Sequence, residues 1–419
     1  MTTPVTETGP EPSDTGTPSD LRRKLVRSNR RRQYTALALL APALVLMTFA
    51  FVLPIGGLLI NAVQAPVFVD TAPQLAAALR AWDGKAMPNE DTHRLLVEEF
   101  GRTYQDKTLA RASTRVNYER SGMRSLIMKT GRRAKRLEAP YRKALQKISP
   151  DWGELTTWHA LKAASSPLTD RFVLQAVDLK RDFDAGISQV DPRKRVYVDR
   201  LRLTFWISLV VTLMCAAIGY PMAYLIATSG TTASRILLAL VLLPFWTSLL
   251  VRTAAWVVLL QKEGIINDSA IWLGLFDSPQ QLIFNRTGVY VAMVHILLPF
   301  LVRPLYSVMK SIPRDHTRAA ASLGARPFAA FLTVYFPQTI PGLGAGCLLV
   351  FILSIGFYIT PALVGGSADQ LISAMIAEFA LGTANWGLAS ALALVLLCCV
   401  AIVYPLFGRY AGARNLRLG

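Results

Sequence analysis

The hydrophobic residues of this chain gather in long, nearly unbroken runs, unlike the short periodic patterns of soluble helices and strands. An apolar run of about 20 residues crosses roughly 30 Å of hydrocarbon as a helix. Six such runs occur, at about 35–62, 203–228, 235–260, 288–309, 342–364 and 387–408. Because a helix satisfies its own backbone hydrogen bonds in lipid, this pattern predicts an all-α integral membrane protein with six transmembrane helices.

Polar residues occupy the ends of the chain and one long block after the first run. Residues 1–34 are expected to form a basic tail, disordered at its start because Pro, Thr, Gly and acidic residues bury no core. Residues 409–419 form a second tail, and residues 203–408 a core of five runs. The block at 63–202 contains LLVEEFGRTYQDKTLARA and YRKALQKI, with apolar residues three and four apart, and predicts an insertion of four to six short helices. This insertion is either a docking or gating surface or a solvated element with structural use only.

The charges change this picture through their placement. With 52% hydrophobic and 17% charged residues, the chain has the balance of a membrane protein, so its net charge of +18 does not indicate a nucleic-acid partner. The short loops 261–287 and 365–386 hold only Lys262 and Arg286, whereas cations cluster at the alternate helix ends. These cations are Arg22, Arg23, Lys24, Arg27, Arg30, Arg31, Arg32, Arg235, Lys310, Arg314, Arg318, Arg326, Arg409, Arg414 and Arg417. The positive-inside rule therefore predicts that both termini are cytoplasmic and that the 63–202 block is extracytoplasmic.

The chain lacks the residue patterns of catalytic, metal and nucleotide sites. No His, Asp or Glu cluster has metal-ligand spacing, and no nucleophile stands with a partner base. The cysteines all fall inside predicted spans, where they suit packing: Cys215, Cys347, Cys398 and Cys399. There is no G-x-x-x-x-G-K-[ST] phosphate loop, and the glycines of PGLGAG predict close helix packing. We expect no catalytic residue, no metal and no cofactor in this chain.

Between the fourth and fifth runs lies a helical pattern too polar to span. PRDHTRAAASLG begins with Pro313, which suits a first helical turn, and ends with Gly324, which suits a left-handed cap. Pro327 begins a second helix, PFAAFLTVYF, which Pro337 is expected to end. The consecutive alanines leave one side of the first helix bare, which is typical of a helix that lies in a groove of another protein.

At these residues the chain resembles the inner-membrane permeases of binding-protein-dependent ABC importers. Their signature is Glu-Ala-Ala, three residues, Gly, nine residues, Ile, one residue, Leu-Pro. Here the matching positions are Arg318, Ala319, Ala320, Gly324, Val334, Phe336 and Pro337, so an arginine stands in place of the signature's glutamate. YPMAYLIA, LLPFWTSLLVRTAAWVVLL, KEGIINDSAI, LLPFLVRPLYSVMKSIP and LLVFILSIGFYITPALVGG resemble the spermidine/putrescine-type branch, in the same order.

The resemblance implies that residues 313–337 are coupling helices that fit a groove in a separate ATPase subunit. The implied contact residues are Arg318, Ala319, Ala320, Gly324, Pro327, Phe328, Phe331 and Pro337. It also implies a lipid-embedded bacterial inner-membrane complex with a second permease, two ATPase subunits that bind ATP and Mg, and an extracytoplasmic solute-binding protein. The expected solute is a polyamine or a related amine. The alternatives are another small organic solute, such as an amino-acid or opine-like compound, and a channel without ATPase partners.

Polar side chains in or beside the predicted spans are costly in lipid, so each is a candidate for the solute path. They are Thr247, Ser248, Arg252, Trp256, His295, Tyr358, Thr360 and Glu378. Ser248, Arg252 and Trp256 are four residues apart and share one helix face. Arg252 is either a gate residue or a cation that snorkels to the interface, and Trp256 either attracts a cationic solute or anchors its helix. Tyr358 and Thr360 mark a predicted local break of the fifth span.

Overall fold

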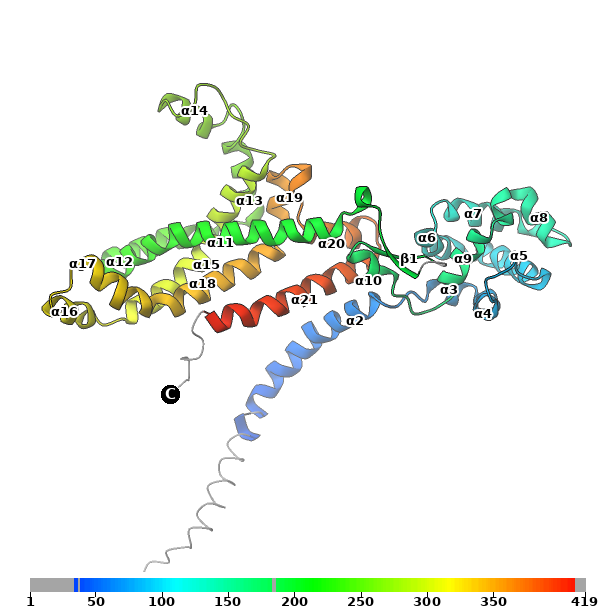
Figure 1. Ribbon diagram of the computed structural model, residues 1–419, viewed down its shortest axis with the longest axis horizontal. Coiled ribbons are helices and arrows are strands. Elements are labelled where there is room, and N and C mark those ends of the chain that lie inside the picture. Colours follow the sequence, from blue (N-terminus) through cyan, green and yellow to red (C-terminus); the bar gives the residue numbers. More distant parts are fainter. Residues whose placement is uncertain (1–33, 37, 183–185, 411–419) are drawn as a thin grey trace, which may run out of the picture. The chain divides into compact units, whose positions relative to one another are not determined.

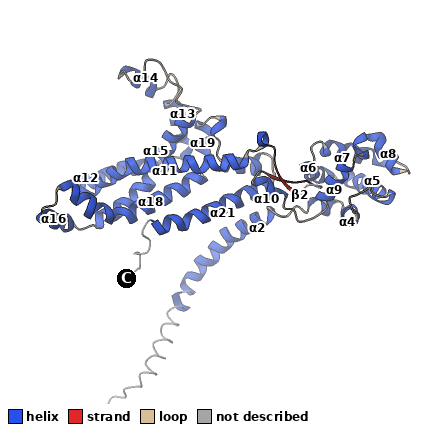
Figure 2. Cartoon of the chain, in the orientation of Figure 1, coloured by secondary structure: helices blue, strands red, loops and turns tan. Residues whose placement is uncertain are grey.

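The computed structural model describes residues 34–36, 38–182 and 186–410, which are almost entirely helical (Figure 1, Figure 2). Among these described residues, five helices are long and apolar enough to cross a membrane, and a bent pair of shorter helices passes the same test together, which gives six when the pair is counted as one span. The predicted all-α fold class with six spans is thereby confirmed. The predicted tails at 1–34 and 409–419 lie outside the described residues except for residues 34, 409 and 410.

The described residues up to Leu58 form a structural unit of their own. The first span, Ala38–Asn61, begins in this unit and is the helix predicted at 35–62. A π turn at Thr48–Val52 interrupts it, and α2 (Leu53–Asn61) completes it. None of the residues in its most apolar window is buried, which is the pattern that contact with lipid favours.

The polar block after the first span contains, in its described residues, eight α-helices and one β-hairpin. The helices are α3 (Val67–Thr71), α4 (Pro73–Ala81), α5 (Glu90–Gln105), α6 (Leu109–Glu119), α7 (Met123–Arg133), α8 (Tyr141–Ile148), α9 (Leu155–Ala164) and α10 (Arg171–Ala176). The prediction of four to six helices is too low, although YRKALQKI is α8 as expected. LLVEEFGRTYQDKTLARA divides into α5 and α6 because Lys107 between them has a positive φ of 59°, which no helix continues through.

Residues 64–168, which we call the insertion, close on themselves. Gln64 pairs with Leu168 in an isolated antiparallel bridge, and the N–H of Ala65 donates to the carbonyl of Pro167 at 2.8 Å. Between these ends the helices bury an apolar core of their own, which includes Phe68, Leu75, Leu79, Phe100, Trp152 and Trp158. Because its ends meet and its core is self-contained, the insertion has the organisation of a domain inserted into a loop.

The chain continues to the second span through residues 169–196, which we call the linker. The linker contains α10 and the antiparallel strands β1 (Leu179–Asp182) and β2 (Gly186–Gln189). Phe172 of α10 packs in one apolar cluster with Leu388 of α21, the last helix. The linker therefore fastens the insertion side of the chain to the final span.

The centre of the membrane core is made of three long helices, α11 (Tyr197–Thr228), α15 (Arg286–Ser311) and α18 (Phe336–Gly356), which share one apolar cluster. A Cβ atom at Gly346 would lie only 3.0 Å from the carbonyl oxygen of Leu301. Small residues permit such close approach of helices in membranes, so the predicted packing role of PGLGAG is confirmed at this position. Shorter helices and the last span accompany these three, namely α14 (Ile265–Trp272), α16 (Arg314–Ser322), α20 (Ile372–Ala377) and α21 (Trp386–Tyr410).

The third span, predicted at 235–260, is bent. It consists of α12 (Thr231–Leu242), a 3₁₀ turn at Leu243–Trp246 and α13 (Leu249–Leu259), with a bend of 96°. Pro244 lacks the N–H needed to continue α12, and the side chain of Ser248 caps the start of α13. The bend turns α13 away from the direction of α12 (Figure 1).

The fifth span differs from its prediction at its start and agrees with it at its end. α17 (Pro327–Ala330) continues through a π turn at Phe331–Tyr335 into α18, so that residues 327–356 form one helix and the prediction that Pro337 ends it is wrong. A proline ring clashes with the carbonyl four residues earlier, and here that residue lies in the π turn, whose wider geometry accommodates it. At the other end α18 stops and α19 (Ile359–Val364) begins, which confirms the predicted break.

Candidate functional site

Between α15 and α18 the chain forms what we call the helical corner: α16, Gly324 and α17. Gly324 has a φ of 87°, the left-handed conformation that its position in the sequence predicts. The N–H of Ala325 donates to the carbonyl of Ala320 at 3.0 Å, which satisfies the end of α16. Pro327 then occupies the first turn of α17, so the two helices meet at a fixed turn.

The helical corner presents apolar side chains to its surroundings. No residue of α16 is buried, and the side chains of Leu323 and Phe328 are 89% and 72% exposed. Ala319 and Ala321 are also exposed, and because their side chains are single methyl groups, another molecule can approach the backbone of α16 closely. Adjacent exposed apolar groups of this kind mark a surface that contacts another molecule.

The base of the helical corner is fastened to the core. Arg314 donates to the carbonyl of Thr228 at 3.0 Å, at the end of α11. Phe331, which the sequence places among the contact residues, instead lies edge-on to Tyr224 of α11 with 5.6 Å between ring centroids. Phe331 therefore belongs to the anchored base, whereas Phe328 belongs to the exposed surface.

Arg318 lies on the exposed side of α16. Its guanidinium is 3.5 Å from the carboxylate of Asp315, and both side chains are largely exposed, so this ion pair contributes little to stability. The guanidinium thus remains available to another molecule. Pro337, the last of the predicted contact residues, is exposed in the first turn of α18.

A second group of predicted residues lies where α13, α15 and α19 meet. The hydroxyls of Thr253 and Thr360 are 3.0 Å apart and both residues are fully buried. This contact ties α13 to α19 across the break of the fifth span. Thr253 is not among the residues predicted for the solute path, although it follows Arg252 directly in TSLLVRTAAW.

Trp256 and His295 are brought together from α13 and α15. The indole Nε1 of Trp256 donates to Nδ1 of His295 at 3.1 Å, and the two rings meet edge-on. Because Nδ1 accepts this bond, the neutral imidazole carries its proton on Nε2. His295 also lines an apolar cavity of about 370 Å³ between α11, α12 and α15. An apolar cavity with one imidazole in its wall suits the binding of a small solute.

Arg252 lies one turn before Trp256 on α13. Its Nε and Nη1 atoms are buried and have no hydrogen-bond partner among the described residues. A buried guanidinium without an acceptor is costly. The group is therefore suited to receive an oxygen acceptor from another molecule or another subunit.

The remaining predicted residues do not join this group. Thr247 donates to the carbonyl of Pro244 at 2.8 Å and Ser248 caps α13, so both shape the bend of the third span. Tyr358 precedes α19 and is 39% exposed, and Glu378 is exposed in a π turn after α20. No group of three His, Cys, Asp or Glu residues that could hold a metal occurs in the part of the chain that the structure describes.

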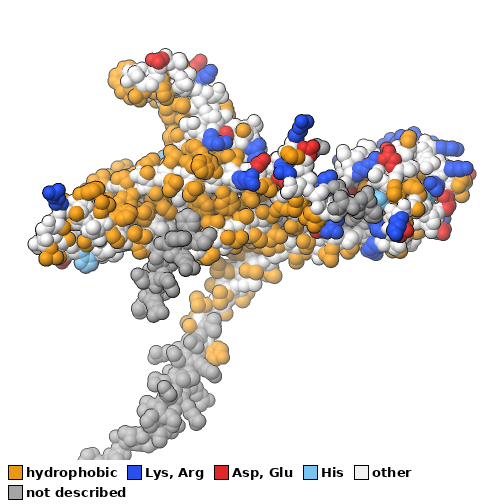
Figure 3. Space-filling view, viewed as in Figure 1, with side chains coloured by type: hydrophobic (Ala, Val, Ile, Leu, Met, Phe, Trp, Pro, Cys, Tyr) orange, Lys and Arg blue, Asp and Glu red, His pale blue; other side chains and the backbone are white. Residues whose placement is uncertain are grey.

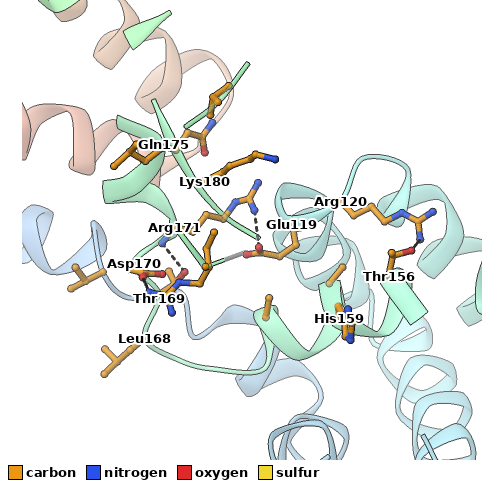
Figure 4. A pocket seen from close by; sticks show the side chains of 17 residues that line it. Glu119, Arg120, Thr156, His159, Leu168, Thr169, Asp170, Arg171, Gln175 and Lys180 are labelled. Carbon is orange, nitrogen blue, oxygen red and sulfur yellow. Dashed lines mark hydrogen bonds and ion pairs between the residues drawn. The ribbon is translucent and has the colours of Figure 1, made fainter. Parts of the chain in front are cut away.

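A cavity of about 1240 Å³ lies where α6 and α9 of the insertion face the linker (Figure 4). Arg171 of α10 and Glu119 of α6 point toward one another there, with 2.7 Å between Nη1 and Oε2. Glu119 also accepts a bond of 2.5 Å from Arg115, whose guanidinium lies 5.7 Å from the ring centroid of Phe172. These contacts join the insertion to the linker helix that packs on α21.

Comparison with known proteins gives consistent matches for the membrane core. Residues 205–411 match the family described as "Binding-protein-dependent transport system inner membrane component", so the insertion lies outside the matched region. The chain is 31% identical over 223 residues to the spermidine/putrescine transport system permease protein PotB of Escherichia coli (strain K12), which covers 53% of this chain and 81% of that protein.

Two further matches come from a second permease and a solved structure. The chain is 31% identical over 228 residues to the inner membrane ABC transporter permease protein YdcU of Escherichia coli (strain K12), covering 51% of this chain and 72% of that protein. The crystal structure of a bacterial alginate ABC transporter in complex with alginate pentasaccharide-bound periplasmic protein aligns with a TM-score of 0.43 at 15% identity, over 52% of this chain and 80% of that chain.

Proposed function

The chain belongs to the family of binding-protein-dependent transport system inner membrane components, and on this basis we propose that it forms one half of the membrane path of an ATP-driven importer. It is a multi-pass permease of the inner membrane. In this proposal its partners are a second permease, two ATPase subunits that bind ATP and Mg, and an extracytoplasmic solute-binding protein. Both termini and the helical corner are cytoplasmic, and ATP hydrolysis occurs in the ATPase subunits.

The observation that carries the proposal is the helical corner. Leu323 and Phe328 are apolar and exposed at a fixed turn whose base is bonded to the core, and this combination supports a contact with a separate rigid protein. The low alanine surface of α16 allows that protein to approach the helix closely. We therefore assign the helical corner as the ATPase-coupling element.

Coupling in this mechanism follows from the continuity of α17 with α18. The helix Pro327–Gly356 has 30 residues and is therefore about 45 Å long, which is enough to cross the hydrocarbon region of a membrane. When the ATPase subunits close on ATP, a displacement of the helical corner tilts this helix as a unit. The far end of this helix, at the break before α19, then moves relative to α13, which Thr253 joins to Thr360 of α19.

The solute is proposed to be a polyamine or a related amine. The 31% identity to PotB, which is named for spermidine and putrescine, supports this, as does the aromatic face of Trp256 beside His295. A second candidate class, carboxylate-bearing solutes such as amino-acid or opine-like compounds, is favoured by the unpartnered guanidinium of Arg252. Uptake of radiolabelled solutes by reconstituted complexes discriminates the two classes. A labelled solute of the transported class is taken up, and an excess of the same unlabelled solute reduces its uptake, whereas a labelled solute of the other class is not taken up.

The coupling assignment is tested by enlarging the helical corner. Ala321→Trp places a large ring on the exposed alanine surface of α16, and overpacking of a close contact costs about 1–3 kcal/mol, or roughly 5- to 150-fold in affinity for the ATPase. Gly324→Val makes the left-handed turn unfavourable and misdirects α17. Both variants are expected to lose uptake while the chain still inserts in the membrane.

A matched control is Ala81→Trp, the same change at an exposed alanine of the insertion, which should leave uptake normal. Normal uptake and normal stimulated ATP hydrolysis in both corner variants would refute the coupling assignment.

A further inference from the structure

The surface formed by α7, the 3₁₀ turn Ala134–Arg136 and α8 carries nine cations and a single acid, Glu138. All nine cationic side chains belong to exposed residues, and we call this surface the cationic face. Its members are Arg124, Lys129, Arg132, Arg133, Lys135, Arg136, Arg142, Lys143 and Lys147. Figure 3 shows Lys and Arg side chains over this end of the insertion.

The cationic face is compensated only slightly from within, by the carboxylate of Glu90 on α5, which accepts a hydrogen bond from the backbone N–H of Arg142 at 3.3 Å. Among the described residues, none of its nine cations forms an ion pair with a carboxylate, whereas other insertion arginines pair with Glu98, Glu99, Glu119 and Glu154. Lys129 donates to the carbonyl of Ile148 at 2.8 Å, which holds α7 beside the end of α8 and keeps both basic surfaces together. Largely uncompensated like charges at this density repel one another, so the face is better explained by an external anionic partner than by stability.

Apart from Lys129 and from Arg132, whose Nε donates to the hydroxyl of Tyr104 at 3.4 Å, these cations make no side-chain hydrogen bond among the described residues. The apolar side chains of both helices, such as Ile127 and Leu145, are fully buried in the core of the insertion. The cations occupy the opposite sides of the helices. Replacement of the cations therefore leaves the core contacts intact, which makes the surface open to mutational test.

Two observations indicate a soluble protein as the partner in preference to the membrane surface. No large apolar side chain between residues 68 and 167 is exposed, whereas helices that bind a membrane surface insert apolar side chains into it. In addition, α8 lies at the end of the insertion that is remote from β1 and the linker, and α7 lies between α6 and that end (Figure 1). A contact made by charge alone, away from the junction with the spans, suits a protein that binds and leaves repeatedly.

We propose that the cationic face docks an acidic surface of the extracytoplasmic solute-binding protein and accelerates its encounter with the permease. This inference rests on the proposed function, because it requires a binding protein that cycles on and off. Complementary charge raises association rates by about 10- to 1,000-fold at low salt and affects dissociation less. The insertion thus supplies a docking surface additional to the membrane core.

The test uses the complete transport complex in phosphatidylcholine nanodiscs and a binding protein identified as cognate by its stimulation of ATP hydrolysis by that complex. The reversal variant carries R133E, R136E, K143E and K147E. The charge-preserving control carries R133K, R136K, K143R and K147R. A position control carries K85E and R111E, at exposed cations of the insertion outside the cationic face.

At low salt, the reversal variant is expected to associate with the binding protein at least about tenfold more slowly, with a smaller change in dissociation. Both controls should associate at the wild-type rate. Added salt should slow association of the wild type and of both controls, but should not slow association of the reversal variant. Equal association rates for wild type and reversal variant, with equal far-ultraviolet circular dichroism, would overturn the inference while leaving the proposed function intact.

Two other outcomes would also overturn the inference, for different reasons. If the reversal variant binds the solute-binding protein normally, and the wild-type complex but not the reversal variant adsorbs to phosphatidylglycerol vesicles, the partner of the cationic face is lipid. If no extracytoplasmic protein stimulates ATP hydrolysis by the wild-type complex, the proposed function itself fails.

Discussion

Gly387→Ala provides a quantitative test of how the linker is seated on the last span. A Cβ atom at Gly387 of α21 would lie 2.3 Å from Cε2 of Phe172 and 2.6 Å from two other atoms of the ring. The ring has little room to withdraw, because Phe172 is only 3% exposed and lies under the guanidinium of Arg115. The added methyl group therefore forces α10 away from α21.

Two opposed effects set the size of the change. Overpacking of a buried contact costs about 1–3 kcal/mol. Replacing glycine by alanine within a helix stabilises it by roughly 0.5–1 kcal/mol. With the middle of each range, the free energy of unfolding should fall by about 1 kcal/mol in Gly387→Ala.

A double-mutant cycle with Phe172→Leu isolates the steric part. The shorter side chain removes the ring atoms that the new methyl group would strike, so Gly387→Ala in this background should be neutral or slightly stabilising. The assay is the denaturant midpoint of the purified chain, and Gly57→Ala, which has no atom within 4 Å of the new Cβ, is the control and should not destabilise. A stable Gly387→Ala variant, or the same effect in both backgrounds, would refute the predicted contact.

Three other predictions address the core and the insertion. Thr253→Val should destabilise the complex by about 1 kcal/mol because it leaves the buried hydroxyl of Thr360 with one fewer partner, whereas the double variant with Thr360→Val should recover most of the loss in thermal unfolding. Arg252→Ala should impair solute uptake but not subunit assembly in size-exclusion chromatography, and normal uptake would assign Arg252 to interface anchoring. Burial lowers the pKa of His93 below its ordinary 6.5. As the pH falls through 6.5, the unfolded chain therefore binds more protons than the folded chain, and the free energy of unfolding decreases. Unfolding midpoints at about pH 7.5 and 5.5 should show this loss, and His93→Gln should reduce it.

The sequence predicts those features that depend on runs and local signals. The apolar runs correspond to spans because hydrocarbon sets one length for every crossing, and Gly324 marks a left-handed turn because few other residues adopt one. The break beside Tyr358 is likewise local. The helical corner, whose caps and low alanine surface are read directly from PRDHTRAAASLG, is therefore the most predictable part of the candidate site.

Features that depend on tertiary contacts are not predictable in this way. Pro244 permits either a kink or a reorientation of 96°, and packing against α15 and α19 decides between them. Trp256 and His295 are 39 residues apart, so nothing local indicates their hydrogen bond. Pro337 has the local appearance of a helix end, but the π turn before it allows the helix to continue.

In the proposed mechanism the helical corner binds an ATPase subunit. This contact is tested by purifying the affinity-tagged chain from its own membrane in mild detergent, in a cysteine-free background that carries either Ala321→Cys or Ala81→Cys for cross-linking. We expect an ATP-hydrolysing subunit to co-purify in both cases and to cross-link only through residue 321. Recovery of the chain without any ATPase subunit, or cross-linking through residue 81 and not through residue 321, would contradict the account.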